Sequence, residues 1–251
     1  MTDNKGEMSF WEHLEVLRWS ILRVGIALLA AFCVSFAFMP RLFDSVILAP
    51  TKGDFFVYRL FSGLFTGDFN IDIININVTT PFFTHMSTSF WLALIAVFPY
   101  LVWEVWRFIA PALYPSEKKG VKGAFLGVTI LFYIGCAIGY LIIFPVTFRF
   151  LAGYQIGTDI VTQISLNSYI STFLSIIFVM GIVFEMPVLA WMLSVLGILH
   201  KPVLKKYRKV AVVVLLVLAA VITPTGDPFT LTVVFIPLYL LYELSIAIVK
   251  P

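Results

Sequence analysis

Charged residues are scarce in this sequence. Only 12% of its 251 residues are Asp, Glu, Lys or Arg, whereas 61% are hydrophobic; soluble domains have about 25% charged and about 45–50% apolar residues. A water-soluble fold has no interior large enough to bury so much apolar surface. The net charge of +3 is also too small for a nucleic-acid-binding face. The composition therefore indicates an integral membrane protein.

Residues that ligate metals or act as nucleophiles are also few. The two cysteines, Cys33 and Cys136, lie inside apolar runs, so we expect small buried side chains and no disulfide. The three histidines are far apart, and His85 is expected on the opposite side of the membrane from His13 and His200, which argues against a shared metal site. Zinc-protease, phosphate-loop and nucleophile-elbow motifs are absent. We therefore predict no enzyme activity, no metal and no cofactor.

Long apolar segments divide the chain. A membrane-crossing helix needs about 20 residues for about 30 Å of hydrocarbon. Residues 1–251 are expected to form a single all-α membrane domain whose six spans lie at approximately 21–39, 81–109, 123–144, 169–196, 210–222 and 229–249. The fifth span has only about 13 residues, or about 20 Å of helix. Spans five and six therefore form a short hairpin, which should thin the bilayer locally or be hidden by neighbouring helices.

Basic residues predict the orientation of these spans. Of the 17 Lys and Arg residues, only Arg41, Lys52, Arg59 and Arg149 fall on one side. Cytoplasmic loops carry the excess of Lys and Arg, so the other side faces the cytoplasm. Both chain ends are then cytoplasmic, and the long first loop, 41–80, is a structured periplasmic segment.

Acids gather at the amino-terminal entry to the first span. Residues Ser9–Trp19 are expected to form an amphipathic helix with Glu12 and Glu15 on one face. Two interpretations stay open. These acids either complement the helix dipole, with Glu15 paired to Arg18, or they bind a cationic ligand.

A second acidic position follows the end of span two. The stretch 103–119 ends a helix in an aromatic, proline-broken turn, after which Glu117 stands before two lysines. Glu104 and Arg107 are spaced at i,i+3, so we expect them to neutralise each other. Glu117 has no comparable partner in the sequence.

Three more acids lie in or beside the last three spans. Glu185 falls near the middle of span four, and Pro187 leaves the carbonyl near Val183 without its helical partner. An acid at this depth costs several kcal/mol unless it is protonated, paired or hydrated. Either it is a functional group, or it is protonated and bonded to a neighbouring helix. Asp227 and Glu243 belong to the last hairpin, where Asp227 is suited to cap span six.

Together these segments resemble the TatC family, the multispanning subunit of the twin-arginine protein translocase. The family opens with Glu-His-Leu-x-Glu-Leu-Arg, and this chain has a similar run at Glu12–Arg18. The second acid of the pattern falls at Val16, and Glu15 stands one position earlier. Further similar segments are Trp106–Tyr114, Glu117–Lys119, Phe144–Pro145, Phe184–Pro187, Thr223–Pro224 with Asp227, and Leu241–Glu243.

The resemblance implies a receptor in the bacterial inner membrane for signal peptides with two consecutive arginines. It would pass these peptides and their folded cargo to single-span TatA/TatB-type subunits in a multimeric complex, with export driven by the proton-motive force. Paired guanidiniums favour bidentate carboxylates. The expected signal-peptide residues are Glu12, Glu15, Glu117 and Arg18. The expected intramembrane partner contact is Glu185 with Pro187, and the last hairpin adds Asp227 and Glu243.

A different function class is also compatible with a membrane-embedded acid. A proton-coupled secondary transporter of a small solute would use Glu185 as a site near the bilayer midplane. Such transporters are built from inverted repeats with paired broken helices. No internal repeat is visible in the sequence, which favours the translocase interpretation.

Overall fold

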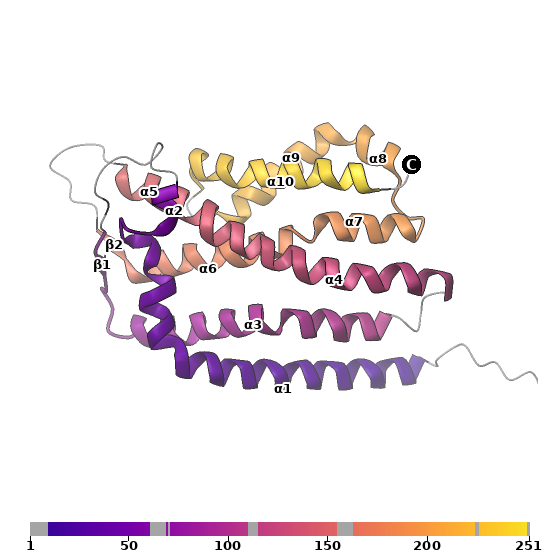
Figure 1. Ribbon diagram of the computed structural model, residues 1–251, viewed down its shortest axis with the longest axis horizontal. Coiled ribbons are helices and arrows are strands. Elements are labelled where there is room, and N and C mark those ends of the chain that lie inside the picture. The colour runs from indigo at the N-terminus through magenta and orange to yellow at the C-terminus, as the bar shows by residue number, and fades with distance from the viewer. Residues whose placement is uncertain are drawn as a thin grey trace, which may run out of the picture.

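The computed structural model describes residues 10–60, 69, 71–109, 115–154, 163–223 and 226–249. Long helices lie side by side in one elongated bundle (Figure 1). Five helical stretches are long and apolar enough to cross a membrane: Leu14–Thr51, Thr80–Phe108, Phe125–Gly153, Leu166–Val195 and Pro228–Ile248. The all-helical membrane architecture predicted from the composition is therefore confirmed.

The bundle is built from helices of very different length. In chain order they are α1 (Phe10–Leu42), the π-helix η1 (Phe43–Ile47), the 3-10 helix η2 (Ala49–Thr51), α2 (Phe56–Leu60), strand β1 (Ile73–Ile74), α3 (Thr80–Ile109), α4 (Pro115–Ile138), the π-helix η4 (Gly139–Ile143), α5 (Phe144–Gly153), strand β2 (Ile164–Ser165), α6 (Leu166–Val183), α7 (Met186–Val195), α8 (Lys201–Lys206), α9 (Arg208–Ile222) and α10 (Pro228–Ile248).

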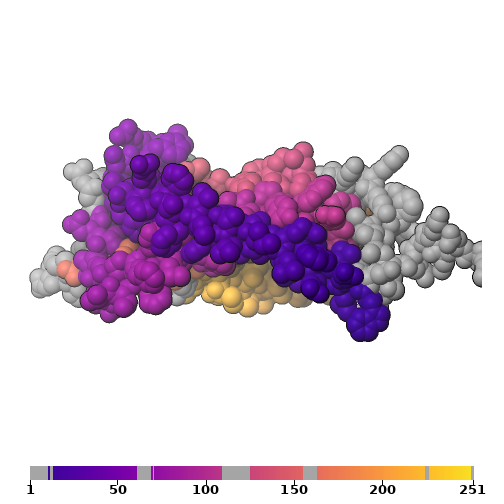
Figure 2. All heavy atoms as spheres, turned by 90° about the horizontal axis from the view of Figure 1, so that it is seen from below, coloured from indigo at the N-terminus to yellow at the C-terminus, as the bar shows by residue number. Residues whose placement is uncertain are grey.

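The two ends of the bundle differ. One end, here called the cap end, carries α2 and the parallel pair of β1 with β2. The opposite end holds the start of α1 and the end of α10, and we call it the termini end (Figure 1). Figure 2 shows α1 running along one face of the molecule between these two ends. The described residues of the predicted loop 41–80 contain short helices and also strand β1. The first apolar helical stretch continues to Thr51, so the first span ends later than the predicted residue 39.

An ion pair joins α1 to α3 within the apolar bundle. The Arg23 Nε and Nη2 atoms each donate to one carboxylate oxygen of Glu104, at 2.8 Å in both cases. Arg23 Nη2 also donates to Ser20 Oγ at 3.1 Å, and the Tyr100 hydroxyl donates to Glu104 at 3.1 Å. The expected neutralisation of Glu104 by Arg107 is therefore wrong, because the neighbouring helix supplies a bidentate partner.

Glycines bring α4 and α6 into close contact. A Cβ atom on Gly135 would lie 2.5 Å from the Met180 carbonyl oxygen, and one on Gly181 would lie 2.7 Å from Cys136 Sγ. Small residues at helix crossings are the usual means of close packing in a membrane, where lipid tails are as apolar as the side chains. The side chain of Phe132, fully buried beside this crossing, fills the remaining space.

The stretch Leu166–Val195 is two helices and not one. Helix α6 ends where the Phe184 amide donates to the Met180 carbonyl at 3.0 Å, and the Glu185 amide turns back to Ile182 at 3.0 Å. Pro187 then stands in the first turn of α7, where its missing N–H costs nothing. The proline therefore places a helix break, with Glu185 at the break, inside an apolar span.

The cap end is held by aromatic side chains. The Tyr58 hydroxyl donates to the Pro50 carbonyl at 2.8 Å. The Arg149 guanidinium lies 4.9 Å from the Tyr58 ring centroid and 4.8 Å from that of Phe69, within the range of cation–π attraction. Burial raises the pKa of Tyr58, against the opposing charge of Arg149, so its hydroxyl stays protonated and remains a donor.

The ion pair predicts an asymmetric effect of its two deletions. Arg23→Leu leaves the Glu104 carboxylate, 3% exposed, without its partner, and we expect a loss of about 3–5 kcal/mol of stability. Glu104→Leu should cost less, because Arg23 is 34% exposed and can extend towards water. Thermal unfolding of the purified variants in one detergent measures the difference. The control is Arg208→Leu, which removes the exposed Arg208–Glu243 pair and should cost under about 1 kcal/mol; equal losses for all three variants would contradict the assignment.

The α4–α6 crossing predicts different results for two Gly-to-Ala changes on one helix. Gly135→Ala forces a methyl group against backbone, so we expect a loss of about 1–3 kcal/mol. Gly127→Ala meets only Val188 Cγ2 at 3.9 Å and should be neutral or gain up to about 1 kcal/mol from helix propensity. The melting temperatures of the two variants check this. A Gly135→Ala protein as stable as Gly127→Ala would show that the crossing is looser than described.

Candidate functional sites

The predicted acidic site lies at the termini end, and part of it falls outside the described side chains. Glu15 and Arg18 are exposed on the first turns of α1. The side chains of Glu12 and Glu117 lie outside the description, although their backbones belong to the first turns of α1 and α4. Both helix starts are at the same end of the bundle, with the end of α3 between them in the chain (Figure 1).

Arg18 has a neighbour other than the one expected from its spacing. Its guanidinium lies 5.9 Å from the ring centroid of Trp19. Among the described side chains, Glu15 and Arg18 form no ion pair, so the pairing considered from the sequence is not observed. The Glu15 carboxylate is therefore open to solvent and accessible to a cationic ligand.

Glu185 occupies a polar position in an otherwise apolar wall. Its side chain is 7% exposed. The carboxyl group lies beside the backbone of Phe132 on α4, yet neither of its oxygens makes a hydrogen bond to a described residue. Thr129 Oγ1 also has no partner, and it stands three residues before Phe132 on the same face of α4. Among the described residues, Glu185 and Thr129, together with Thr147 and Thr230, have buried side-chain oxygens without a hydrogen-bond partner.

Such unused groups are costly in a membrane. A buried polar group without a hydrogen bond costs about 1–3 kcal/mol by mutational estimates. Glu185 is therefore an acid that can form one or two hydrogen bonds, as donor or acceptor, with a polar group from another molecule. Pro187 contributes by holding the helix break open at this position.

The two acids assigned to the last hairpin are not brought together. Asp227 Oδ1 accepts from the Thr230 amide at 2.7 Å and caps α10 at the cap end, as its position in the sequence suggested. Glu243 accepts from Arg208 Nη2 at 2.6 Å and from the Tyr239 hydroxyl at 3.2 Å at the termini end. About 24 Å of helix separates the two acids. Each therefore stabilises the structure locally, and the two do not form a common site.

The Arg23–Glu104 pair was missed by reasoning from the sequence. Its signal was present, because Arg23 stands inside an apolar stretch and an intramembrane charge requires a partner. Spacing within one helix directed attention to Arg107 instead.

Among the described residues there is no group of three or more His, Cys, Asp or Glu side chains suited to a metal ion.

Comparisons with known proteins agree over nearly the whole chain. The family model for the Sec-independent protein translocase protein (TatC) matches residues 12–237. The TatC protein of Blattabacterium sp. subsp. Periplaneta americana is 36% identical and covers 99% of this chain and 97% of its own length. A crystal structure of the twin arginine translocase receptor TatC has a TM-score of 0.76 at 31% identity, covering 94% of this chain and 97% of that chain.

A second crystal structure of that receptor, in DDM, gives a TM-score of 0.78 at 30% identity and covers 96% of this chain and all of that one. The similarity thus extends through the sequence, the fold and the full length of the relatives. With its five long apolar helical stretches, the protein is a multi-pass protein of the bacterial inner membrane and a component of a protein translocase. The chain belongs to the TatC family of Sec-independent protein translocase proteins.

Proposed function

We propose that this chain is the receptor subunit of a twin-arginine translocase. It binds signal peptides with two consecutive arginines and passes them, with folded cargo, to single-span TatA/TatB-type subunits, and the proton-motive force drives export. The proposal is supported by the family membership and by the two similar solved structures, each described as a twin arginine translocase receptor. The exposed Glu15 at the termini end is the observation that carries it.

The proposed topology has six crossings in one domain, with the termini end in the cytoplasm. Helix α9 has 15 residues, about 22 Å of helix, and makes the short fifth crossing. The Arg208–Glu243 pair at the termini end and the short turn at Gly226 and Asp227 at the cap end are consistent with an α9–α10 hairpin. The exposed lysines of α8 and the start of α9, Lys205, Lys206 and Lys209, support a cytoplasmic termini end.

The proposed peptide site consists of Glu12, Glu15, Glu117 and Arg18 at the starts of α1 and α4. Two adjacent peptide guanidiniums need carboxylates that accept bidentate hydrogen bonds. The Arg23–Glu104 pair lies about two helical turns from Glu15 and fixes α1 against α3. A rigid support of this kind holds the carboxylates in position before the peptide arrives, which reduces the entropy lost on binding.

The proposed site predicts a preference for Arg-Arg over Lys-Lys peptides, although the two peptides carry the same charge. An Arg-Arg signal peptide should bind at least about tenfold more tightly than its Lys-Lys counterpart, because Lys cannot form the bidentate contact. Glu15→Gln and Glu117→Gln should each remove most of the preference. The measurement is a binding isotherm of a fluorescent peptide on the protein in nanodiscs. Glu243→Gln, a charge change at the same end of the bundle but outside the site, is the matched control and should leave the isotherm unchanged.

Two results would count against the peptide site. One is equal affinity for the two peptides. The other is an Arg-Arg preference that survives in the double variant Glu15→Gln, Glu117→Gln. In the second case Glu12 would be the next residue to change, since it is the acid that matches the family pattern directly.

For hand-off to a partner, the proposed contact is Glu185 with Pro187. A polar group without a hydrogen bond in an apolar wall favours a partner helix that supplies one. The short α9 adds a place where the bilayer is thinned beside this wall. Asp227 and Glu243 contribute by fixing α10 next to α9.

The partner contact predicts different effects of two Glu185 variants. Glu185→Gln keeps hydrogen bonding and should retain most crosslinking to a single-span subunit. Glu185→Leu should lose crosslinking and export, although it relieves a buried unpaired group and should not lower the melting temperature. Site-specific photo-crosslinking together with thermal unfolding measures both. Intact export by a stable Glu185→Leu protein would restrict Glu185 to a structural role.

A further inference from the structure

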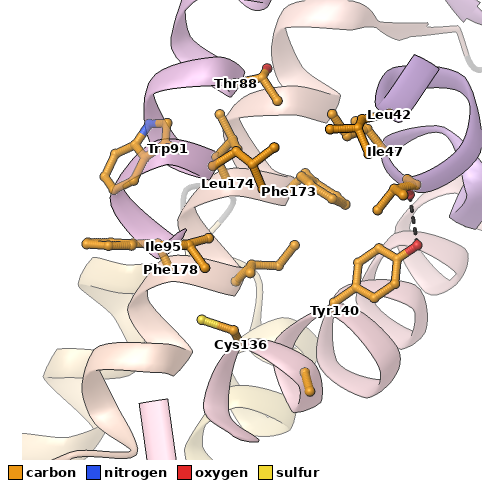
Figure 3. Close-up of a pocket in the computed structure, with 14 residues that line it drawn as sticks. Leu42, Ile47, Thr88, Trp91, Ile95, Cys136, Tyr140, Phe173, Leu174 and Phe178 are labelled. Atoms are coloured by element: carbon orange, nitrogen blue, oxygen red, sulfur yellow. Dashed lines mark hydrogen bonds between the residues drawn. The ribbon is translucent and has the colours of Figure 1, made fainter. Parts of the chain in front are cut away.

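A cavity of about 270 Å³ lies between the end of α1 with η1, α3, α4 with η4, and α6 (Figure 3). Its wall includes Ile47, Trp91, Cys136, Tyr140 and Phe173. All of these elements belong to stretches that are apolar and long enough to cross a membrane. The cavity is thus within the membrane-spanning part of the bundle, and neither Glu15 nor Glu185 is among its lining residues.

Two π-helices form one side of this cavity. Val46 and Ile47 come from η1 and Tyr140 from η4, and the Tyr140 hydroxyl donates to the Val46 carbonyl at 2.8 Å, as the dashed line in Figure 3 shows. A second hydroxyl, that of Tyr169, donates to the Ile47 carbonyl. π-helical turns are rare and occur frequently at functional sites. Both π-helical turns therefore border a space that side chains do not fill.

The two hydroxyl groups on the wall of the cavity already use their hydrogens within the protein, so neither is free to donate to a ligand. Thr88 Oγ1 already donates to the Thr84 carbonyl at 2.6 Å, and the Tyr140 hydroxyl is engaged with Val46. Ordered water needs two to four polar partners, and a cavity of about 150 Å³ lined by apolar side chains binds benzene instead. The larger space found here therefore suits an apolar molecule. A partner helix, about 10–12 Å wide with its side chains, is too thick to enter.

A second groove, which is lined in part by polar side chains, adjoins this cavity on the side of the cap end. It has a volume of about 640 Å³, lies between the first turns of α3 and α6, and shares Trp91 and Leu174 with the cavity. Its polar lining consists of uncharged side chains, among them Asn77, Thr80, Ser87, Asn167, Ser171 and Ser175. An apolar cavity next to a groove that carries hydroxyl and amide groups has the same order as the acyl chain and head group of a lipid.

We propose that the cavity and the groove together bind one membrane phospholipid. One acyl chain enters between η1, α3, η4 and α6, and the head group lies in the groove among hydroxyl and amide groups. Because none of the described residues that line the groove is Lys, Arg, Asp or Glu, we expect head-group charge to have little influence on binding. The bound lipid fills the space that the two π-helices leave and acts as a fixed part of the bundle.

The experiment uses the full chain in nanodiscs and a phosphatidylethanolamine with a diazirine on one acyl chain. After irradiation, labelled peptides should map to 88–95 and 173–178, and native mass spectrometry should retain one phospholipid per chain. Ala137, exposed at the edge of the cavity, is changed to Phe to fill the entrance. Leu126→Phe, at an exposed site on the same helix about three turns away, is the control. We expect Ala137→Phe to reduce labelling of these two segments at least fivefold and Leu126→Phe to leave it unchanged.

Three outcomes would overturn the proposal. They are equal labelling in the two variants, loss of all phospholipid from the wild-type protein in native mass spectrometry, and replacement of the lipid label by a crosslink to a single-span subunit when that subunit is present. A phosphatidylglycerol probe with the same chain should label equally; a difference above about tenfold would show a charged head-group contact that the groove does not contain. Melting temperatures verify that the variants are folded. Ser171→Leu changes the groove but not the cavity, so it tests the position of the head group separately.

Discussion

The absence of water in the hydrocarbon layer governs this structure, because every polar group there must find its partner within the protein. The Arg23–Glu104 pair is the strongest response to that requirement, with two 2.8 Å bonds between guanidinium and carboxylate. It joins α1, whose start carries three of the four residues of the proposed peptide site, to α3. A charged pair that could drift apart at a protein surface is held here by the low dielectric around it, so α1 and α3 behave as one support.

The same requirement explains the backbone around the cap end. A π-helical turn displaces carbonyls from regular helical bonding, and the Tyr140 and Tyr169 hydroxyls bind the carbonyls of Val46 and Ile47. These bonds link η4 and α6 to η1 across a large sequence separation. Aromatic side chains therefore do two things: their rings supply apolar packing, and their hydroxyls satisfy the irregular backbone. The cavity beside the π-helices is a consequence of that irregularity.

Much of the architecture could be predicted from hydropathy and from proline and glycine positions. The apolar segments predicted the long helical stretches, and residues 41–80 were predicted to form a structured segment outside the membrane. Asp227 was predicted to cap a helix because Asp before an apolar run is a common N-cap. The partner of Glu104 was not predictable from spacing, because i,i+3 geometry describes one helix and the actual partner comes from a residue 81 positions away. The break at Glu185 follows from Pro187, but the lack of a hydrogen bond there depends on which atoms of α4 face it.

The Arg23–Glu104 pair satisfies its polar groups within the protein, whereas the carboxyl group of Glu185 makes no hydrogen bond to a described residue. The region around Glu104 is therefore fixed, and the region around Glu185 is adaptable. Glu104 accepts three hydrogen bonds, two from Arg23 and one from Tyr100. Removing these bonds costs much stability, so the end of the bundle that Glu104 supports keeps one geometry. Glu185 makes no hydrogen bond to any described residue, so any helix that supplies a donor or acceptor there stabilises the complex and relieves the unpaired group at the same time. The proposed receptor holds a peptide at one place and accepts partner subunits at another, and it needs both kinds of region. Glu117 and Phe132, the residue beside which Glu185 lies, are about 22 Å apart along α4 by helical rise.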